Sequence, residues 1–590
     1  MLTAKTFVDT LEMPFSRRGS YICFAGENGG SNEYGKARLW LSTSRQRSKD
    51  KNNGEQFRTN RFRQIKLEIV ENGLARQCVV STTPYELILE SIPGSVRFCI
   101  GDHKYAKCWS TDGVTLRITP VHSGMFGSGT FDMLDGTWKA SFGNYFMLFV
   151  PTAGMLVQGP GGSIDLVPDE NGVIEMAMEE SLIDPKRRDS YLSYEESVAA
   201  VKADFDEFSG RFLPALPDEY SETGLRALWT LWGLTVIPDG ETVYKRHMIK
   251  MIRASFEAAY SWQHGMHAMF LSHDLKLAWE LLLSSFDAQD STGRIADALA
   301  YNGPADTMKP PIQGLGILWL MERHDLSVMP ANELEYLWDR LEKWVDFHLN
   351  YRDLDHDGIF ESHSRGETGW ESGSYYTVGF PLAQPDLNAY LALCEEALAR
   401  LGRLIGRNAE VCSYWEAKSK DTIRKIIDMC WTNDGWTAVN TATGARSGAT
   451  GLALYCTLLL GKRLPQEIID RSIEIIYGEP GYDTPFGFAS EALDSPYFQH
   501  GWCSGSIATP IQALLAIAFD ACGRPELARA VAKKYLNTLN LHGLYHIHDT
   551  YTGEVEYRFT NMKFFDEQDL FYSGWTAGCY IFFAQHFGLV

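Results

Sequence analysis

The chain has 590 residues, of which 75 are acidic and 54 basic, so its formal net charge at pH 7 is −21. This charge excludes nucleic-acid binding by bulk electrostatics, because phosphates attract the opposite sign. The content of apolar residues (45%) and charged residues (22%) is typical of globular proteins and excludes wholesale disorder. The length predicts at least two domains. No apolar run approaches the roughly eighteen residues of a membrane span, and we expect no secretory signal at the N-terminus.

The eleven cysteines form no CxxC pair. Their scattered, odd-numbered pattern favours buried, reduced thiols in a cytoplasmic protein over a disulfide framework or a cysteine metal cluster.

Residues 1–190 contain short runs of β-branched and aromatic residues separated by Gly, Pro and Asn. This texture predicts an antiparallel β-sandwich. The clearest strand candidates are 78–82, 85–89, 96–100, 114–118 and 145–150.

The texture changes at Ser193, which with Glu196 fits a capping box and predicts a linker helix within residues 191–216. Residues 217–590 then show apolar spacings of three and four. The predicted helices are 222–234, 256–286, 312–321, 333–349, 386–404, 410–430, 449–460, 464–476, 507–522, 525–539 and 573–587. The sequence lacks the fixed short repeat that a solenoid needs. We therefore predict a closed (α/α)6 barrel whose long loops build a pocket at one end.

One loop has carboxylates at alternate positions around a glycine that permits a tight turn. Hard oxygen ligands in this pattern suit Ca²⁺, although the glutamate that completes an EF-hand is missing and a solvated turn is the alternative. We expect no cofactor for the chemistry and a possible structural Ca²⁺, with these candidate ligands: Asp353, Asp355, Asp357, the carbonyl of Ile359, and Glu361.

A second signal lies a few residues later, where Glu371 follows Trp370 between two glycines. An indole that desolvates a carboxyl group raises its pKa, which a general acid for glycosidic bond cleavage requires. An ordinary loop–helix junction is the alternative.

The helical part, over residues 255–580, resembles the glycosidases of family 63 and their trehalase-like relatives. The resemblance is carried, in chain order, by Trp262-Gln263, Lys309-Pro310-Pro311 (Gln-Pro-Pro in the family), Gly369-Trp370-Glu371, Asp386-Leu387-Asn388, 431–436, 546–553 and Trp575-Thr576. It implies an (α/α)6 barrel and an inverting glycosidase, with Glu371 in the position of the general acid.

Two departures from the family bear on the chemistry. The aspartate that holds sugar hydroxyls in the relatives is Gln263 here, and the catalytic base, a glutamate in the relatives, is His546. A neutral imidazole can act as a base. Otherwise a nearby carboxylate replaces it (Glu554, Glu556 or Glu567), or the reaction is not hydrolysis by inversion.

The predicted catalytic residues are therefore Glu371, His546 and Glu554. The same loops supply these candidates for sugar binding: Trp262, Gln263, His264, Lys309, Gln313, Trp370, Tyr376, Trp502 and Trp575. For each tryptophan, a role in the hydrophobic core is the alternative.

These residues predict an exo-acting inverting glycoside hydrolase that removes an α-linked glucose or mannose unit from a small glycoside or oligosaccharide. One alternative is a carbohydrate epimerase or lyase on the same barrel that uses His546; another is a non-catalytic sugar-binding protein. The expected partner is a small sugar substrate, and a homo-oligomer is possible.

Overall fold

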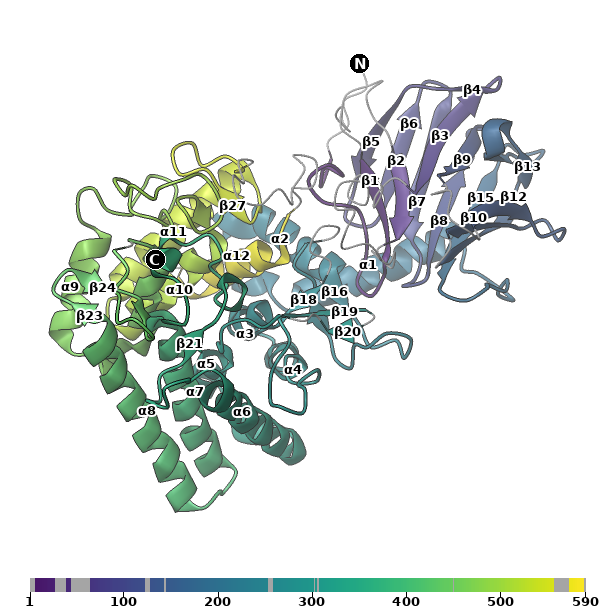
Figure 1. The fold of residues 1–590 in the computed structure, drawn as a ribbon. Helices are drawn as coiled ribbons and strands as arrows, with labels where there is room; N and C mark the ends of the chain where they lie inside the picture. Colours follow the sequence, from purple (N-terminus) through teal and green to yellow (C-terminus); the bar gives the residue numbers. More distant parts are fainter. Residues whose placement is uncertain are drawn as a thin grey trace.

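The structure is a computed structural model, which describes residues 6–26, 39–43, 64–121, 128–142, 145–252, 258–301, 303–304, 307–448, 450–556 and 572–587. Its N-terminal part consists of antiparallel sheets, and its C-terminal part is helical (Figure 1). The N-terminal sheet region and the helical region that follows it are both as predicted.

Two antiparallel sheets make up the N-terminal part. The first has the order β1 (Ile22–Gly26), β2 (Leu39–Thr43), β3 (Ile65–Glu71), β9 (Thr115–Pro120), β14 (Ile164–Val167) and β13 (Met155–Gln158), with β4 (Leu74–Ala75) paired to β3. The second has the order β10 (Ser128–Asp132), β11 (Trp138–Phe142), β12 (Phe146–Ala153), β15 (Ile174–Ser181), β8 (Tyr105–Ser110), β7 (Gly94–Ile100), β6 (Leu87–Ser91) and β5 (Cys78–Thr82).

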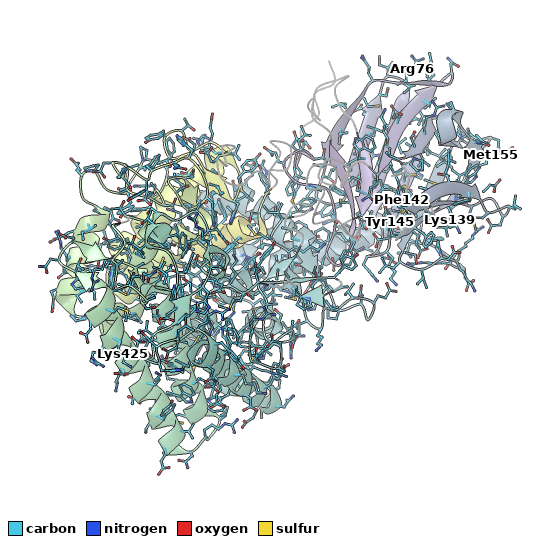
Figure 2. The ribbon with its side chains drawn as sticks, viewed as in Figure 1. Arg76, Lys139, Phe142, Tyr145, Met155 and Lys425 are labelled. Carbon is cyan, nitrogen blue, oxygen red and sulfur yellow. The ribbon has the colours of Figure 1, made fainter. Side chains whose placement is uncertain are left out.

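Buried side chains alternate along several of these strands, as in β3, where Ile65, Leu67 and Ile69 are buried. This period of two directs one face of the strand into a hydrophobic core to which both sheets contribute. Figure 2 labels Phe142 and Tyr145 in this part, and their rings stack with centroids 4.7 Å apart.

Helix α1 (Tyr194–Gly210) follows the sheets and has the predicted capping box. The Ser193 hydroxyl accepts from the Glu196 amide, and the Glu196 carboxylate accepts from the Ser193 amide. On this helix Asp204 forms an ion pair with Arg18 and accepts a hydrogen bond of 2.7 Å from the indole of Trp232. The helix therefore connects the sheet part to the helical part.

Eleven further α-helices lie in the described residues: α2 (Ser221–Leu234), α3 (Ser261–Phe270), α4 (Leu275–Ser284), α5 (Gln313–Arg323), α6 (Ala331–Tyr351), α7 (Pro385–Leu404), α8 (Ala409–Cys430), α9 (Gln466–Ile476), α10 (Thr509–Ala521), α11 (Pro525–His542) and α12 (Gly574–His586). The 3-10 segments are η1 (Pro160–Gly162), η2 (Leu213–Ala215), η3 (Asp218–Tyr220), η4 (Leu326–Val328), η5 (Arg365–Glu367), η6 (Ser374–Val378) and η7 (Leu452–Arg463).

Short two- and three-residue strands fix the loops between the helices. They are β16 (Thr235–Val236), β17 (Met248–Ile249), β18 (Ala259–Tyr260), β19 (Ala298–Ala300), β20 (Gly303–Pro304), β21 (Glu361–Ser362), β22 (Leu382–Ala383), β23 (Trp431–Thr432), β24 (Gly435–Trp436), β25 (Val439–Asn440), β26 (Ile507–Ala508) and β27 (Ile547–His548).

Two helix predictions need correction. The single helix expected over 256–286 is instead the pair α3 and α4, because Asp274 accepts from the Leu277 amide and starts a new helix. The α-helix expected over 449–460 is the 3-10 segment η7, with a non-helical Gly461 at φ +57°.

The helices contact one another in a ring that closes on itself. Within it, α3 contacts α5, α5 contacts α7, α7 contacts η7, η7 contacts α10, α10 contacts α12, and α12 contacts α3. Outside it, α2 contacts α12, α4 contacts α3, α6 and α8 contact α7, α9 contacts η7, and α11 contacts α10. Every residue of α3 is buried, whereas α9 has one buried face, as inner and outer helices require.

The N-terminal segment also reaches the last loops of the helical part. The carboxylate of Glu12 accepts hydrogen bonds from the phenols of Tyr545 (3.2 Å) and Tyr572 (2.9 Å), and its carbonyl accepts from the Tyr572 amide at 2.7 Å. Glu12 therefore ties the start of the chain to its end.

All eleven cysteines are buried free thiols, as predicted. Among the helices of the described ranges, we find none with the length and hydropathy to cross a bilayer.

Candidate active site

Five aromatic side chains that the sequence singled out meet in a closed ring of contacts. They come from separate parts of the chain: α3, the loop after η5, the loop before β26, the residue before β27, and α12. The distances between ring centroids are 4.8 Å for Trp262–Trp370, 6.3 Å for Trp370–Trp502, 4.7 Å for Trp502–His546, 5.6 Å for His546–Trp575 and 5.0 Å for Trp575–Trp262. We call these five residues the aromatic ring.

Glu371 lies at the edge of the aromatic ring. The indole nitrogen of Trp502 donates to its Oε2 at 2.9 Å, and the ammonium of Lys309 forms an ion pair with its Oε1. Lys309 also donates to the Gly366 carbonyl at 2.8 Å, which fixes the ammonium in place. The Glu371 side chain keeps 26% of its surface exposed, so it remains reachable from solvent.

The expected shielding of Glu371 by its neighbour Trp370 is not what the structure shows. The indole nitrogen of Trp370 donates to Asp386 on α7 at 3.0 Å, and Asp386 is fully buried. Burial raises the pKa of Asp386 to about 7. Glu371 instead pairs with the Lys309 ammonium and the Trp502 indole.

Asp297, just before β19, is a member of this site that the sequence did not reveal. Its Oδ2 lies 4.0 Å from the Lys309 nitrogen and accepts from the Thr307 hydroxyl at 3.2 Å. Burial raises the pKa of Asp297 to about 6; nearby Glu371 also raises it, and Lys309 lowers it. The only signal in the sequence was Lys309 itself, a charged residue where relatives have glutamine.

A second titratable cluster brings together His500, Asp549 and Glu556. The Nδ1 of His500 lies 3.4 Å from Asp549 Oδ2 and 3.3 Å from Glu556 Oε2. Both carboxylates are buried, and the Ser506 hydroxyl donates to Glu556 at 3.3 Å. The imidazole of His500 thus lies between two buried carboxylates.

One loop, 499–506, connects the two clusters. Trp502 from this loop contacts Glu371, while His500 and Ser506 contact Glu556. The Ser372 hydroxyl also accepts from the amide of Cys503, so the loop is tied directly to the residue after Glu371. Two carboxylates thus contact a single loop.

The predicted catalytic residue Glu554 does not join either cluster. It is exposed on a turn, where its amide donates to the Thr552 hydroxyl at 3.3 Å. Glu556, two residues later, is buried beside His500 and Ser506. Glu567 lies outside the described residues.

His546 is held between the rings of Trp502 and Trp575. Both its ring nitrogens are buried without a hydrogen-bond partner in the described part of the chain. Burial lowers the pKa of His546 to about 3, and His548 contributes in the same direction. The imidazole is therefore neutral and acts as an aromatic wall of the site.

The remaining sugar-binding candidates differ in what they contact. His264 uses both ring nitrogens on the main chain of Ile249 and Tyr260, which favours a structural role. Gln313 accepts from the indole of Trp344 at 3.0 Å, and the Tyr376 hydroxyl donates to the Trp370 carbonyl at 3.0 Å.

Gln263 is a buried candidate whose side-chain amide lacks hydrogen-bond partners among the described residues. It is fully buried, and neither its side-chain oxygen nor its nitrogen has a hydrogen-bond partner among the described residues. An amide left without partners in the wall of the site is available to a hydroxyl.

The predicted calcium loop brings its carboxylates together. Oxygens of Asp353, Asp355 and Asp357 lie within 4.8 Å of one another. The Asp357 and Gly358 amides donate to Asp353, and the Ile359 amide donates to Asp357. Gly358 adopts φ +88°, which a side chain would disfavour.

Glu361 also contacts this loop. Its Oε2 accepts from the Leu354 amide at 3.0 Å, while its Oε1 is buried without a hydrogen-bond partner in the described ranges. The carboxylate oxygens of this loop are ligands that suit a hard cation such as Ca²⁺. Lys425 of α8, labelled in Figure 2, donates to the Asp357 carbonyl of this loop.

Comparisons with known proteins give a family match and a shared fold. Residues 257–565 match the family model of the mannosylglycerate hydrolase MGH1-like glycoside hydrolase domain. No curated protein matches.

Solved structures share the fold at low sequence identity. GH63 mannosylglycerate hydrolase from Thermus thermophilus in complex with Tris has a TM-score of 0.52 at 14% identity, over 61% of this chain and 99% of that chain. The same enzyme with Tris and D-glycerate gives 0.51 at 14% identity, over 60% and 98%. A bacterial glucoamylase complexed with acarbose gives 0.59 at 11% identity, over 99% and 95%.

Proposed function

Because this chain belongs to the family of the mannosylglycerate hydrolase MGH1-like glycoside hydrolase domain, we propose that it is an exo-acting, inverting glycoside hydrolase. Its substrate is an α-linked glucose or mannose unit on a small glycoside or oligosaccharide. The observation that carries the proposal is the pair of carboxylates, Glu371 and Glu556, that both accept hydrogen bonds from side chains of loop 499–506.

Glu371 is the general acid of this proposal. Its side chain is partly exposed beside an aromatic surface, where a sugar can stack and bring its glycosidic oxygen within reach. Lys309 and the Trp502 indole set the direction of the carboxyl group.

Glu556 is the proposed base, in place of Glu554. Inversion needs a second carboxylate about 6.5 to 9.5 Å from the acid, with a water between it and the sugar. Glu556 is buried, held by Ser506 and close to His500, and this supports the role better than the exposed Glu554. His546 has no nitrogen exposed to receive a proton, which disfavours the epimerase or lyase alternative.

We further propose that the closed ring of helices is an (α/α)6 barrel formed by residues 217–590, after a β-sandwich of residues 1–190 and a linker of 191–216. The closure from α12 back to α3 supports the barrel. The loop at Asp353 is proposed as a structural Ca²⁺ site with no part in the chemistry.

The experiment compares wild type with E371Q on α-glucosides, α-mannosides and glycosylglycerates, with NMR detection of the anomer released first. We expect release of the inverted anomer by wild type and a loss of kcat of about 10²–10⁴-fold in E371Q, since only the proton donor is removed. D434N, on an exposed turn, is the control for the loss of an acidic side chain. Turnover by E371Q close to wild type would contradict the assignment of the acid.

A further inference from the structure

Lys309 lies between two carboxylates of the active site. Its ammonium forms an ion pair with Glu371 and lies 4.0 Å from Asp297. The Gly366 carbonyl accepts a further hydrogen bond from it at 2.8 Å. We call Asp297, Lys309 and Glu371 the acid triad.

The acid triad contains one cation and two carboxylates in a poorly hydrated place. Asp297 is 8% exposed and Lys309 has a side chain 12% exposed. A second uncompensated negative charge is costly there, so one carboxyl group keeps its proton to a higher pH than an exposed carboxyl group does.

The two carboxylates compete unequally for that proton. Glu371 has the Lys309 ammonium in direct contact, the Trp502 indole as a second donor, and some exposure to water. Asp297 has the ammonium only at 4.0 Å and the Thr307 hydroxyl as donor, and its Oδ1 is buried without a hydrogen-bond partner among the described residues. The proton therefore resides on Asp297.

A general acid in an ion pair with lysine has no proton to give. The other two members of the acid triad must therefore supply a proton to Glu371. The proton stored on Asp297 is separated from Glu371 by one ammonium group, which lies within ion-pair distance of both carboxylates.

We propose that Asp297 is the proton reservoir of the general acid and that Lys309 relays the proton from Asp297 to Glu371. This inference rests on the proposed function of Glu371. The Lys309 ammonium gives one proton to the Glu371 carboxylate and takes one from the Asp297 carboxyl group, leaving an Asp297 carboxylate, a Lys309 ammonium and a Glu371 carboxylic acid.

The protonated Glu371 then gives its proton to the glycosidic oxygen as the glycosidic bond breaks. The proton that the base removes from water is released to solvent, and one proton from solvent reloads the triad through the exposed edge of Glu371. Hydrolysis is therefore neutral in protons over one turnover. The glutamine of the family's Gln-Pro-Pro segment carries no exchangeable ammonium proton for such a relay, so the device depends on the lysine at position 309.

Among the described residues, the titratable groups next to the acid triad do not take up or release its proton. Asp297 faces Lys309 and Glu371, and its pKa is raised to about 6 chiefly by burial. Lys309 and Glu371 also face Cys503, whose pKa burial keeps well above its usual value, so that thiol remains neutral. The alkaline limb of the pH–rate profile should consequently follow the triad.

The test compares the pH dependence of kcat/KM in wild type, D297N and K309Q. Without Asp297, Glu371 faces only a cation, so the alkaline limb should move down by about one pH unit or more. Without Lys309, two carboxylates face each other, so the limb should move up by a similar amount. D434N should leave the limb in place. Limbs that stay fixed, or that move in the same direction, overturn the proposal.

A readout independent of turnover separates this inference from the proposed function. In protein labelled with [γ-¹³C]aspartate, the carboxyl resonance missing from D297N should titrate near pH 6 in wild type and at higher pH in K309Q. A resonance that titrates at the pH of an exposed aspartate overturns the reservoir. Unimpaired turnover by E371Q overturns the acid assignment instead, whatever Asp297 does.

Discussion

The indole nitrogen of Trp502 lies 2.9 Å from the carboxylate of Glu371, although 131 positions separate the two residues in the chain. The same indole stacks on His546. One tryptophan thus orients the proposed acid and connects it to the aromatic ring, and its loop continues to the cluster around Glu556. Several consequences of this arrangement can be measured.

The choice between Glu556 and Glu554 is open to direct comparison. E556Q removes a buried carboxylate beside His500, and E554Q removes an exposed one on the adjoining turn. We expect E556Q to lower kcat by about 10²–10⁴-fold, as loss of a general base does, and E554Q to retain wild-type kcat. Initial rates on the best substrate decide between them, and circular dichroism checks that both variants fold. A larger loss in E554Q than in E556Q would reverse the assignment.

We expect His546 to act as an aromatic wall of the site and not as a catalytic base. Burial holds its pKa at about 3, so it is neutral at working pH, and its nitrogens face no acceptor or donor in the described structure. H546F keeps a flat ring between Trp502 and Trp575, so kcat should fall less than about tenfold, whereas loss of a base costs at least about 10²-fold. H546A, which opens the wall, is the matched comparison and should raise KM. A hundredfold loss of kcat in H546F would make the imidazole the base.

Glu395, in the middle of α7, predicts an unusual pH dependence of stability. It is fully buried, without a hydrogen-bond partner for either oxygen among the described residues, and burial raises its pKa from 4.5 to about 8. Between these values the folded state binds a proton that the unfolded state does not, so the free energy of unfolding falls as pH rises.

E395Q removes that dependence, because an amide does not titrate. Relative to wild type it should gain up to about 4 kcal/mol at pH 8 and under about 1 kcal/mol at pH 5. Thermal unfolding at the two pH values measures the difference. E396Q changes the adjacent glutamate, which pairs with Arg463 at the surface, and should show no such gain. Equal shifts at both pH values would refute a buried, protonated Glu395.

The loop at Asp353 should bind Ca²⁺ and be stabilised by it. Adding Ca²⁺ at 100 times its Kd contributes about 2.7 kcal/mol, seen as an increase in Tm that EGTA reverses. D355N removes one converging carboxylate without touching the hydrogen bonds of Asp353, and should abolish the increase. An unchanged response in D355N, or none in wild type, would identify the loop as a solvated turn.

The sequence predicted most of the fold because its signals are local. The capping box at Ser193, the strand alternation and the apolar helix faces are set by neighbouring residues. The break between α3 and α4 was missed because Asp274 interrupts an otherwise continuous apolar pattern through a cap.

The candidate site was predicted less completely. Family motifs identified Glu371 and the tryptophans of the aromatic ring. Asp297 and His500 carry no motif, and they matter because folding brings them to Lys309 and to Glu556 across loops. Whether Trp370 contacts Glu371 or Asp386 depends on the path of the chain, which adjacency in the sequence does not give.

The hydrogen bonds of Glu12 with Tyr545 and Tyr572 make the two ends of the polypeptide structurally interdependent. Tyr545 precedes His546, so an amino-terminal truncation would free a phenol right beside the wall of the catalytic centre. Separating the sheet part from the helical part at the linker would for this reason remove a contact next to the aromatic ring, far from the cut.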